Sequence, residues 1–431
     1  MNSGSRPASS RVLAIVGGLV AATLSLVSCG AAQTVQVTQA TAQAGVDRVC
    51  ADLGVDRSQC YSLPGGHVAV SRPVGVSRGL LLVDFGGPGL PATAPGQLRA
   101  ELPRWAQHYT VATFAEPWAG RDLTQVCSGY FAHLSWGAPT PAFDQPEVCG
   151  QKVEEWQRPP ISSSVTYLEE TEHQKLAGVV AFSFGVTRTA PLWGLLRSRG
   201  GFLAVVDPAA APSVDGGSVV RERARASLAV LEKEADQWCA GACSDAHALL
   251  AQVGRGQGIN GVSGSQAAAL VLAAAADPGL LPTLKNVAAG PASPKMKIQV
   301  NRVANSFART LDGQGATAAN VGYRSQMCQA YGPVAGSANT GDAYVAALAR
   351  LMGPCDNMPT WDPYSSALPE RTCVVVNKQD PVEPSTLGGP LDSVGATRTV
   401  AYSSPGHQWP QELVAKLGDP AGAWACSNPN G

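Results

Sequence analysis

A serine between small residues follows a short apolar run near the middle of the chain. The run Leu176–Val180 leads into Ala181–Gly185, which reads AFSFG, and helix-forming residues follow. A sharp turn from a strand into a helix exposes a serine hydroxyl at the end of a sheet, and its pattern, G-x-S-x-G, keeps the flanking residues small. Ser183 is therefore the candidate nucleophile, although a chain with 47 glycines can contain such a pentapeptide by chance.

An aspartate and a histidine follow two later strand-like segments. Asp380 lies in a proline-containing turn after Thr372–Val376, and His407 follows Thr397–Tyr402. A serine hydroxyl needs a neutral imidazole to take its proton, and the imidazole needs a buried carboxylate to fix its tautomer. The chain order Ser, Asp, His fits a triad at the ends of parallel strands. We predict the triad Ser183, Asp380 and His407.

A glycine-rich turn supplies a fourth part of the predicted site. Phe85–Gly89, which reads FGGPG, follows the apolar run Leu80–Val83. Such a turn can direct a backbone N–H at the oxygen that becomes negative in a tetrahedral intermediate. We predict an oxyanion hole formed by the N–H groups of Gly87 and Phe184. Taken alone, the motif also fits a surface turn.

These segments together resemble the prolyl aminopeptidase and tripeptidyl aminopeptidase group of serine exopeptidases, from about residue 50 to the C-terminus. Members combine the Gly-Gly-Pro-Gly turn with Gly-x-Ser-Tyr-Gly, Asp-Pro-Val-Thr-Pro and Gly-His. The counterparts here are Ser183–Gly185, Asp380–Pro384 and Gly406–His407. Trp238–Ala240, followed by Cys243, is similar to a segment in the cap of secreted actinobacterial members. The resemblance implies an α/β-hydrolase fold with a mostly parallel sheet and an inserted helical cap.

The chain departs from the family pattern at two places. Members carry Asp-x-Arg-Gly after the strand that follows the glycine-rich turn, whereas Glu116–Arg121 reads EPWAGR and displaces the arginine. Pro191 falls in the helix after Ser183, where its ring and its missing N–H should kink or shorten the helix. Both changes bear on substrate preference, and they keep open the alternative of a catalytically silent protein that binds a ligand in the cell envelope.

Other residues of the triad types are weaker candidates. Asp207 ends the run Leu203–Val206 and is the runner-up acid, because some hydrolases carry the acid on an earlier strand. The remaining histidines lack the strand and turn context of His407, so we expect structural or surface roles for His67, His108, His133, His173 and His247.

The alternation of elements indicates a two-part organisation. Strand-like runs recur at Leu80, Val111, Val179, Leu203, Val374 and Val400. Helical or loop stretches separate them, as in a mostly parallel sheet. Alanine-rich helical patterns such as Val219–Gln237 and Gln266–Ala276 fill the interval before the later strands. We expect a hydrolase core over residues 46–210 and 362–431, and a helical cap over 211–361.

Acidic residues of the expected cap are candidates for substrate recognition. In the aminopeptidase members, cap acids hold the free amino group of the substrate, and one predicted helix here carries Glu222, Glu232, Glu234 and Asp236. The same helix carries Arg221, Arg223, Arg225 and Lys233. A solvated face of paired charges is therefore the favoured interpretation, and no glutamate is assigned a binding role.

The N-terminal residues predict the location of the protein. Arg6 and Arg11 precede the apolar stretch Val12–Val27, which is short for a membrane-spanning helix and suits a signal peptide. Leu26–Cys29 resembles a bacterial lipobox, which implies a signal peptide over residues 1–28, a lipid on Cys29 and a tether over 29–45. We expect a lipid anchor at the outer face of the cell membrane. The alternative is an ordinary secretory signal.

Cysteine content agrees with an oxidising compartment. Setting Cys29 aside from the 11 cysteines leaves ten, an even number. Proximity in sequence suggests the pairs Cys50–Cys60, Cys127–Cys149, Cys239–Cys243, Cys328–Cys355 and Cys373–Cys426. A reactive-cysteine enzyme is the rival interpretation, and it is disfavoured because no cysteine lies on a turn like that of Ser183.

Charge and composition exclude several classes of function. The formal charge is −1 and the basic residues form no stripe, so we expect no nucleic-acid partner. No two of the 6 histidines have the helical spacing of metal ligands, so we expect no metal. A serine, histidine and aspartate triad requires no cofactor, so we expect none.

The resemblance implies a serine hydrolase that acts through an acyl-enzyme on short peptides near a free N-terminus. A carboxylesterase or lipase is the nearest alternative, because the fold does not fix the substrate.

Overall fold

The computed structural model describes residues 49–51, 53, 58–63, 66–87, 93–116, 118–136, 149–151, 161–209, 216–240, 245–311, 315–332, 341–352, 367–384, 399–410 and 413–414. The predicted signal peptide, the lipobox with Cys29 and the tether lie outside these residues. Within the described ranges, no helix combines the length and the hydropathy required to cross a bilayer.

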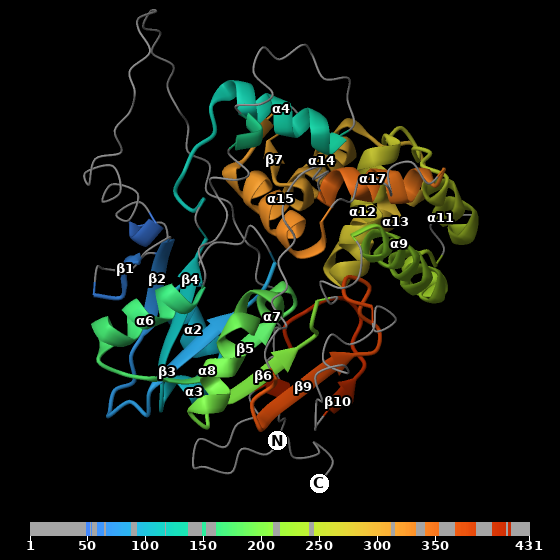
Figure 1. Ribbon diagram of the computed structural model, residues 1–431. Coiled ribbons are helices and arrows are strands. Elements are labelled where there is room, and N and C mark those ends of the chain that lie inside the picture. The colour runs from blue at the N-terminus through green and yellow to red at the C-terminus, as the bar shows by residue number, and fades with distance from the viewer. Residues whose placement is uncertain are drawn as a thin grey trace, which may run out of the picture.

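One large, mostly parallel sheet forms the centre of the fold (Figure 1). Its strands are β1 (Cys60–Leu63), β2 (Gly66–Ser71), β3 (Leu80–Asp84), β4 (Thr110–Ala115), β5 (Leu176–Phe182), β6 (Phe202–Val206), β9 (Arg371–Asn377) and β10 (Thr399–Tyr402). They lie in the order β1-β2-β4-β3-β5-β6-β9-β10, and β2 pairs antiparallel with both β1 and β4 while the other pairs are parallel. The predicted α/β-hydrolase fold is confirmed. The antiparallel β1–β2 hairpin was not anticipated from the sequence.

Helices cover both faces of the sheet. They are α2 (Pro95–Glu101), α3 (Pro103–Ala106), α6 (Ile161–Glu172), α7 (Phe184–Thr189) and α8 (Trp193–Ser198). Successive side chains of a strand point to opposite faces, so strands covered on both sides must be apolar throughout. In β6, Leu203 packs in a cluster with α6, α7 and α8, whereas Ala204 packs in a cluster with α2 and α3. This burial fixes the register of β5 and β6, and with it the ends of these strands.

The helix after Ser183 is interrupted where Pro191 predicts. Helix α7 ends at Thr189, a 3₁₀ turn spans Ala190–Leu192, and α8 begins at Trp193. A proline inside a helix removes one N–H donor and places its ring against the preceding turn. The 3₁₀ turn accommodates both effects, and the predicted shortening is confirmed.

A layer of helices lies over the end of the sheet where the parallel strands finish (Figure 1). We call the elements between β6 and β9 the cap layer: α9 (Gly216–Lys233), α10 (Ala235–Trp238), α11 (Ala246–Gly254), α12 (Gly264–Ala276), α13 (Leu281–Ala288), α14 (Pro294–Ala308), the strand pair β7 (Thr310–Leu311) and β8 (Gly315–Ala316), α15 (Ala318–Tyr331) and α17 (Ala343–Met352). The predicted helical pattern 219–237 divides into α9 and α10, and α12 is buried from Ala267 to Ala275.

One helix from outside this interval packs with the cap layer. Helix α4 (Gln125–Trp136) precedes β5 in the chain, yet it contacts β8, α15 and α17. A hydrogen bond from Ser128 Oγ to the Ala316 carbonyl at 2.9 Å ties α4 to β8. The cap layer therefore packs with segments that come before Ser183 in the sequence as well as with segments that come after it.

Two predicted disulfides are confirmed, Cys50–Cys60 and Cys127–Cys149. Cys239, Cys328 and Cys373 are also disulfide-bonded. The partners expected for them, Cys243, Cys355 and Cys426, lie outside the described residues, so these three pairings stay predictions.

Candidate active site

Ser183 occupies a strained turn between a strand and a helix. Strand β5 ends at Phe182 and α7 begins at Phe184, which leaves Ser183 between them with φ 53° and ψ −128°. A positive φ is uncommon for a residue with a side chain. The turn also requires Gly185, because a Cβ there would lie 2.5 Å from the carbonyl oxygen of Asp84. This is the strand-to-helix geometry that the sequence predicts for a nucleophile.

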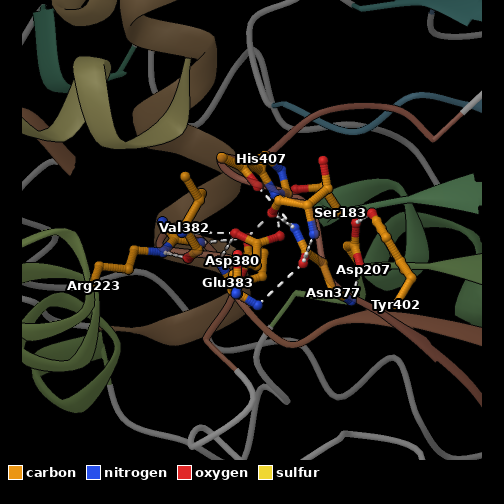
Figure 2. Close-up of polar contacts among 12 residues, drawn as sticks. Ser183, Asp207, Arg223, Asn377, Asp380, Val382, Glu383, Tyr402 and His407 are labelled. Carbon is orange, nitrogen blue, oxygen red and sulfur yellow. Dashed lines mark hydrogen bonds and ion pairs between the residues drawn. The ribbon is translucent and has the colours of Figure 1, made fainter. Parts of the chain in front are cut away.

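Asp380 and His407 form a short hydrogen bond at the ends of neighbouring strands. Nδ1 of His407 lies 2.6 Å from Oδ2 of Asp380 (Figure 2). The other oxygen, Oδ1, accepts the backbone N–H groups of Val382 at 2.8 Å and Glu383 at 2.9 Å. The Phe182 ring stacks on the imidazole with 4.7 Å between ring centroids. When Nδ1 donates to Asp380, Nε2 of the neutral imidazole is left as the proton acceptor.

The three residues of the predicted triad gather at one edge of the sheet, as Figure 2 shows. The Ser183 hydroxyl faces Oε1 of Glu383 at 3.5 Å, which is the upper limit for a hydrogen bond. Among the contacts described for these residues, none joins the Ser183 hydroxyl to His407. Catalytic hydrogen bonds are often loose without substrate, and a rotation about χ1 of Ser183 changes the partner of its hydroxyl.

Asp207, the runner-up acid, lies beside the dyad with other partners. Tyr402 donates its hydroxyl to Oδ2 at 2.5 Å, and the Asn377 N–H donates to Oδ1 at 2.6 Å. Burial, together with the nearby charge of Asp380, raises the pKa of Asp207 to about 7. Of the two carboxyl groups, Asp380 therefore has the geometry of the acid that orients His407.

The loop that carries His407 is tied to the end of β9. The side-chain amide of Asn377 donates to the carbonyl oxygens of Ser404 and Gly406, each at 2.9 Å. Asn377 also accepts the Ser404 N–H at 3.1 Å. One side chain thus holds both ends of the turn that leads to the imidazole.

Three carboxyl groups face His407 and determine its basicity. Burial alone lowers the pKa of His407, whereas Asp380, Glu383 and Asp207 raise it, and the net pKa lies above the ordinary value. A negative neighbour favours the imidazolium that forms when the base takes a proton. The site is therefore electrostatically suited to a proton-accepting histidine.

The glycine-rich turn packs directly against the turn of Ser183. Gly86 and Gly87 have φ of 72° and 51°, and a Cβ on Gly86 would lie 2.9 Å from Cβ of Ser183 and 3.1 Å from the Phe184 nitrogen. The Gly86 carbonyl accepts a hydrogen bond from Nη2 of Arg188 at 3.1 Å. A trans peptide carries C=O and N–H on opposite sides, so the Gly87 N–H points away from Arg188. These positions are compatible with the predicted oxyanion hole.

A buried ion-pair network, which the sequence did not predict, lies beneath both turns. Arg188 on α7 donates from Nε to Oδ2 of Asp84 at 2.9 Å, and its Nη groups form ion pairs with Asp84 and with Glu116. Gln326 on α15 accepts from Arg188 at 3.2 Å and donates to Glu116 at 2.8 Å. The network connects the ends of β3 and β4, helix α7 and the cap layer.

Glu116, the first residue of the departing segment Glu116–Arg121, belongs to this network. Glu116 directly follows β4 and is only 2% exposed, whereas Arg121 is exposed. The buried cation comes from Arg188 instead. Asp84 and Glu116 lie at the ends of adjacent strands, and two acids at such positions indicate that a buried cation is needed between them. The sequence alone did not reveal which arginine would supply it.

A second missed contact joins the cap layer to the triad. Arg223 on α9 was expected on a solvated face, and this is wrong: the residue is 6% exposed. Its Nε donates to the Val382 carbonyl at 2.6 Å, and its Nη2 donates to Oε1 of Glu383 at 2.5 Å. The apolar neighbours of Arg223 on α9, Val219 and Val220, are buried on the same side of the helix, which brings the arginine inward.

The four cap acids occupy other positions. Glu222 forms an ion pair with Arg225 on the outer side of α9, Glu232 and Asp236 are exposed, and Glu234 is half-buried. The acid that does lie near Ser183 is Glu383, at the position where the family pattern has threonine.

Within the described ranges, no three His, Cys, Asp or Glu side chains are grouped in a way that could hold a metal ion.

Comparisons with known proteins give likenesses of structure. No family model matches the sequence, and no curated protein matches it. A proline iminopeptidase-related protein from Thermus thermophilus is 15% identical, with a TM-score of 0.35 and coverage of 83% of this chain and 91% of its own. A proline iminopeptidase from Mycobacterium smegmatis is 14% identical, with a TM-score of 0.38 and coverage of 81% and 91%. An acetylester hydrolase from Corynebacterium glutamicum is 13% identical, with a TM-score of 0.37 and coverage of 82% and 89%. These likenesses do not decide the activity of this chain.

The Arg188 network predicts a large effect on stability. Arg188→Met should leave the carboxylates of Asp84 and Glu116 buried without their cation, and the free energy of unfolding should fall by about 3–5 kcal/mol. Urea denaturation followed by circular dichroism measures the change. Arg197→Met, an exposed arginine of α8, is the control. Equal unfolding midpoints for the two variants would show that the network does not contribute to stability.

The raised pKa of Asp207 predicts a pH dependence. A carboxyl group whose pKa is raised to about 7 keeps its proton in the folded state after the unfolded chain has lost it. Its contribution to stability therefore falls as pH rises from about 4 to about 7. The stability of Asp207→Asn relative to the natural protein should therefore increase between about pH 4 and about pH 7 in urea titrations, and level off above that range. The exposed Asp236→Asn is the control, and a constant difference for Asp207→Asn would contradict the assigned shift.

Proposed function

We propose that this protein is a serine hydrolase in which Ser183 is the nucleophile, His407 the general base and Asp380 the acid that orients it. The observation that carries the proposal is the 2.6 Å hydrogen bond between Asp380 and His407 beside the strained turn of Ser183. A nucleophile, a base and an orienting acid that follow three parallel strands of one sheet, β5, β10 and β9, are the parts that acyl transfer requires.

The proposed reaction proceeds through an acyl-enzyme. His407 Nε2 accepts the Ser183 proton as Oγ attacks the carbonyl carbon, and the imidazolium then gives that proton to the leaving group. The N–H groups of Gly87 and Phe184 stabilise the oxyanion of the tetrahedral intermediate. Loss of one such donor typically lowers kcat by roughly 10²–10³. Water, deprotonated by His407, then hydrolyses the ester and restores the serine.

We further propose short peptides with a free N-terminus as substrates. The resemblance of the sequence to aminopeptidases supports this class, and so does the charge of the site. Three buried carboxyl groups, Asp207, Asp380 and Glu383, lie near the nucleophile with one buried guanidinium, Arg223. An ammonium group is the substrate charge that such an acidic site favours.

A second candidate function follows from the contact of Ser183 with Glu383. A hydroxyl that faces a carboxylate at 3.5 Å is not aligned with its base. This arrangement also suits a hydrolase-fold protein that binds an envelope ligand without turnover. Active-site labelling separates the two functions.

The nucleophile proposal predicts covalent labelling by a fluorophosphonate probe. The natural protein, with residues 1–28 removed, should be labelled, and Ser183→Ala should not be, since the phosphonate forms its bond with Oγ. Turnover in Ser183→Ala should fall by roughly 10⁶-fold. A panel of aminoacyl, tripeptidyl and acyl-ester chromogenic substrates then separates a peptidase from a carboxylesterase or lipase. Ser198→Ala, a solvent-exposed serine of α8, is the control. Absence of labelling in a folded natural protein would leave the ligand-binding function.

We also propose a lipid anchor on Cys29, supported by the lipobox-like sequence Leu26–Cys29. Cys29→Ala should abolish incorporation of a fatty-acid label and partition into detergent, because the lipid is attached through the thiol. Gln33→Ala is the control. A label retained in Cys29→Ala would show that the lipid is attached elsewhere, and a label absent from the natural protein would indicate an ordinary secretory signal.

A further inference from the structure

The cap layer contacts the two loops that carry the Asp380–His407 dyad. At the first point, Arg223 reaches from α9 to the loop of Asp380, as Figure 2 shows. At the second, the His407 N–H donates to the carbonyl of Ala276, the last residue of α12, at 2.8 Å. Gly406 has φ 84°, and a Cβ there would lie 2.5 Å from the same carbonyl oxygen. The dyad is therefore held from the cap layer as well as from the sheet.

Arg223 makes two different bonds with one short segment. Nε donates to the carbonyl oxygen of Val382, and Nη2 donates to the carboxylate of Glu383. The N–H groups of these same two residues donate to Oδ1 of Asp380. A planar guanidinium offers donors at fixed relative directions, so the pair of bonds sets both the position and the orientation of the segment.

The contacts continue without a break from α9 to the imidazole. Asp380 uses Oδ1 to accept from the segment that Arg223 holds, and it uses Oδ2 for His407. A shift of the segment therefore changes the direction in which Oδ2 faces the imidazole. An error of about 1 Å in such a position can lower a catalytic rate by roughly 10²-fold.

We propose that Arg223 is a positioning residue that sets the geometry of the Asp380–His407 dyad from the cap layer. The catalytic consequence rests on the proposed hydrolase function, whereas the geometric claim does not. The packing of α9 against the loop of Asp380 is then required for the geometry of the dyad. This role is separate from any role of the cap layer in enclosing a substrate.

The burial of Arg223 and Glu383 supports a geometric role. A buried ion pair is often no more stabilising than apolar side chains of the same volume. Stability alone therefore gives no reason for a charge pair at this position. The directional bonds of the guanidinium do give one, because an apolar side chain cannot hold the Val382 carbonyl or orient the loop.

The experiment uses two measurements on the folded protein with residues 1–28 removed. The first is the rate constant of fluorophosphonate labelling of Ser183. The second is the proton NMR resonance of the His407 Nδ1–H, which a short hydrogen bond to Asp380 shifts far downfield and which His407→Gln assigns by its loss. The resonance reports the dyad whether or not the protein turns over a substrate.

Arg223→Met should lower the labelling rate constant by roughly 10²-fold and should shift or broaden the resonance. Arg223→Lys should restore part of both, since an ammonium can make one of the two bonds. Arg225→Met, on the exposed side of the same helix, should change neither measurement. Urea denaturation of each variant separates a loss of positioning from a loss of folding.

Arg223→Lys keeps the test available if Arg223→Met does not fold, and Glu383→Gln separates the effect of the neighbouring charge on His407. Glu383→Gln retains an acceptor for Arg223 but removes one of the three carboxylates that raise the pKa of His407, the others being Asp380 and Asp207. The resonance should persist while the titration of His407 moves to lower pH.

A folded Arg223→Met or Arg223→Lys with the resonance and labelling of the natural protein would overturn the proposal. A natural protein with the resonance but no labelling would instead overturn the hydrolase function, and the response of the resonance to Arg223→Met would still decide the role of Arg223.

Discussion

The carboxylate of Asp380 has two oxygens, and each holds a different part of the site. One accepts two backbone N–H groups of its own loop, and the other meets His407 at 2.6 Å. The orientation of the imidazole therefore depends on the conformation of a short turn after β9. The sheet fixes where that turn begins, and Arg223 contacts it from α9. The geometry of the candidate active site therefore depends on both the sheet and the cap layer.

Charge is distributed in two buried groups near Ser183. Below the turn of Ser183, one guanidinium, Arg188, meets the carboxylates of Asp84 and Glu116. On the other side, Arg223 meets Glu383, beside Asp380 and Asp207. Carboxyl groups outnumber guanidinium groups in both. The carboxyl groups of the second group raise the pKa of His407 above its ordinary value.

Local sequence patterns predicted the features of the fold that are determined by residues close together in the sequence. The strand ends before Ser183 and Asp380, the break at Pro191 and two disulfides between near neighbours were readable in this way. The β1–β2 hairpin was missed because its strands are short and carry glycine, histidine and serine. Arg223 was missed for a different reason. An arginine among other charges on a helix has the pattern of a solvated face, and its burial depends on a carboxylate 160 residues away in the chain.

The network around Arg188 has a consequence for how this sequence can change over time. Its members come from the ends of β3 and β4, from α7 and from α15, so no single segment contains the unit. Loss of the arginine alone leaves two buried anions, and loss of one acid alone leaves the cation partly compensated. Substitutions at these positions are therefore coupled, and their effects on stability will not add. Related chains should either retain Arg188 with both acids or replace the group together, which makes these positions a record of descent that the nucleophile motif alone does not provide.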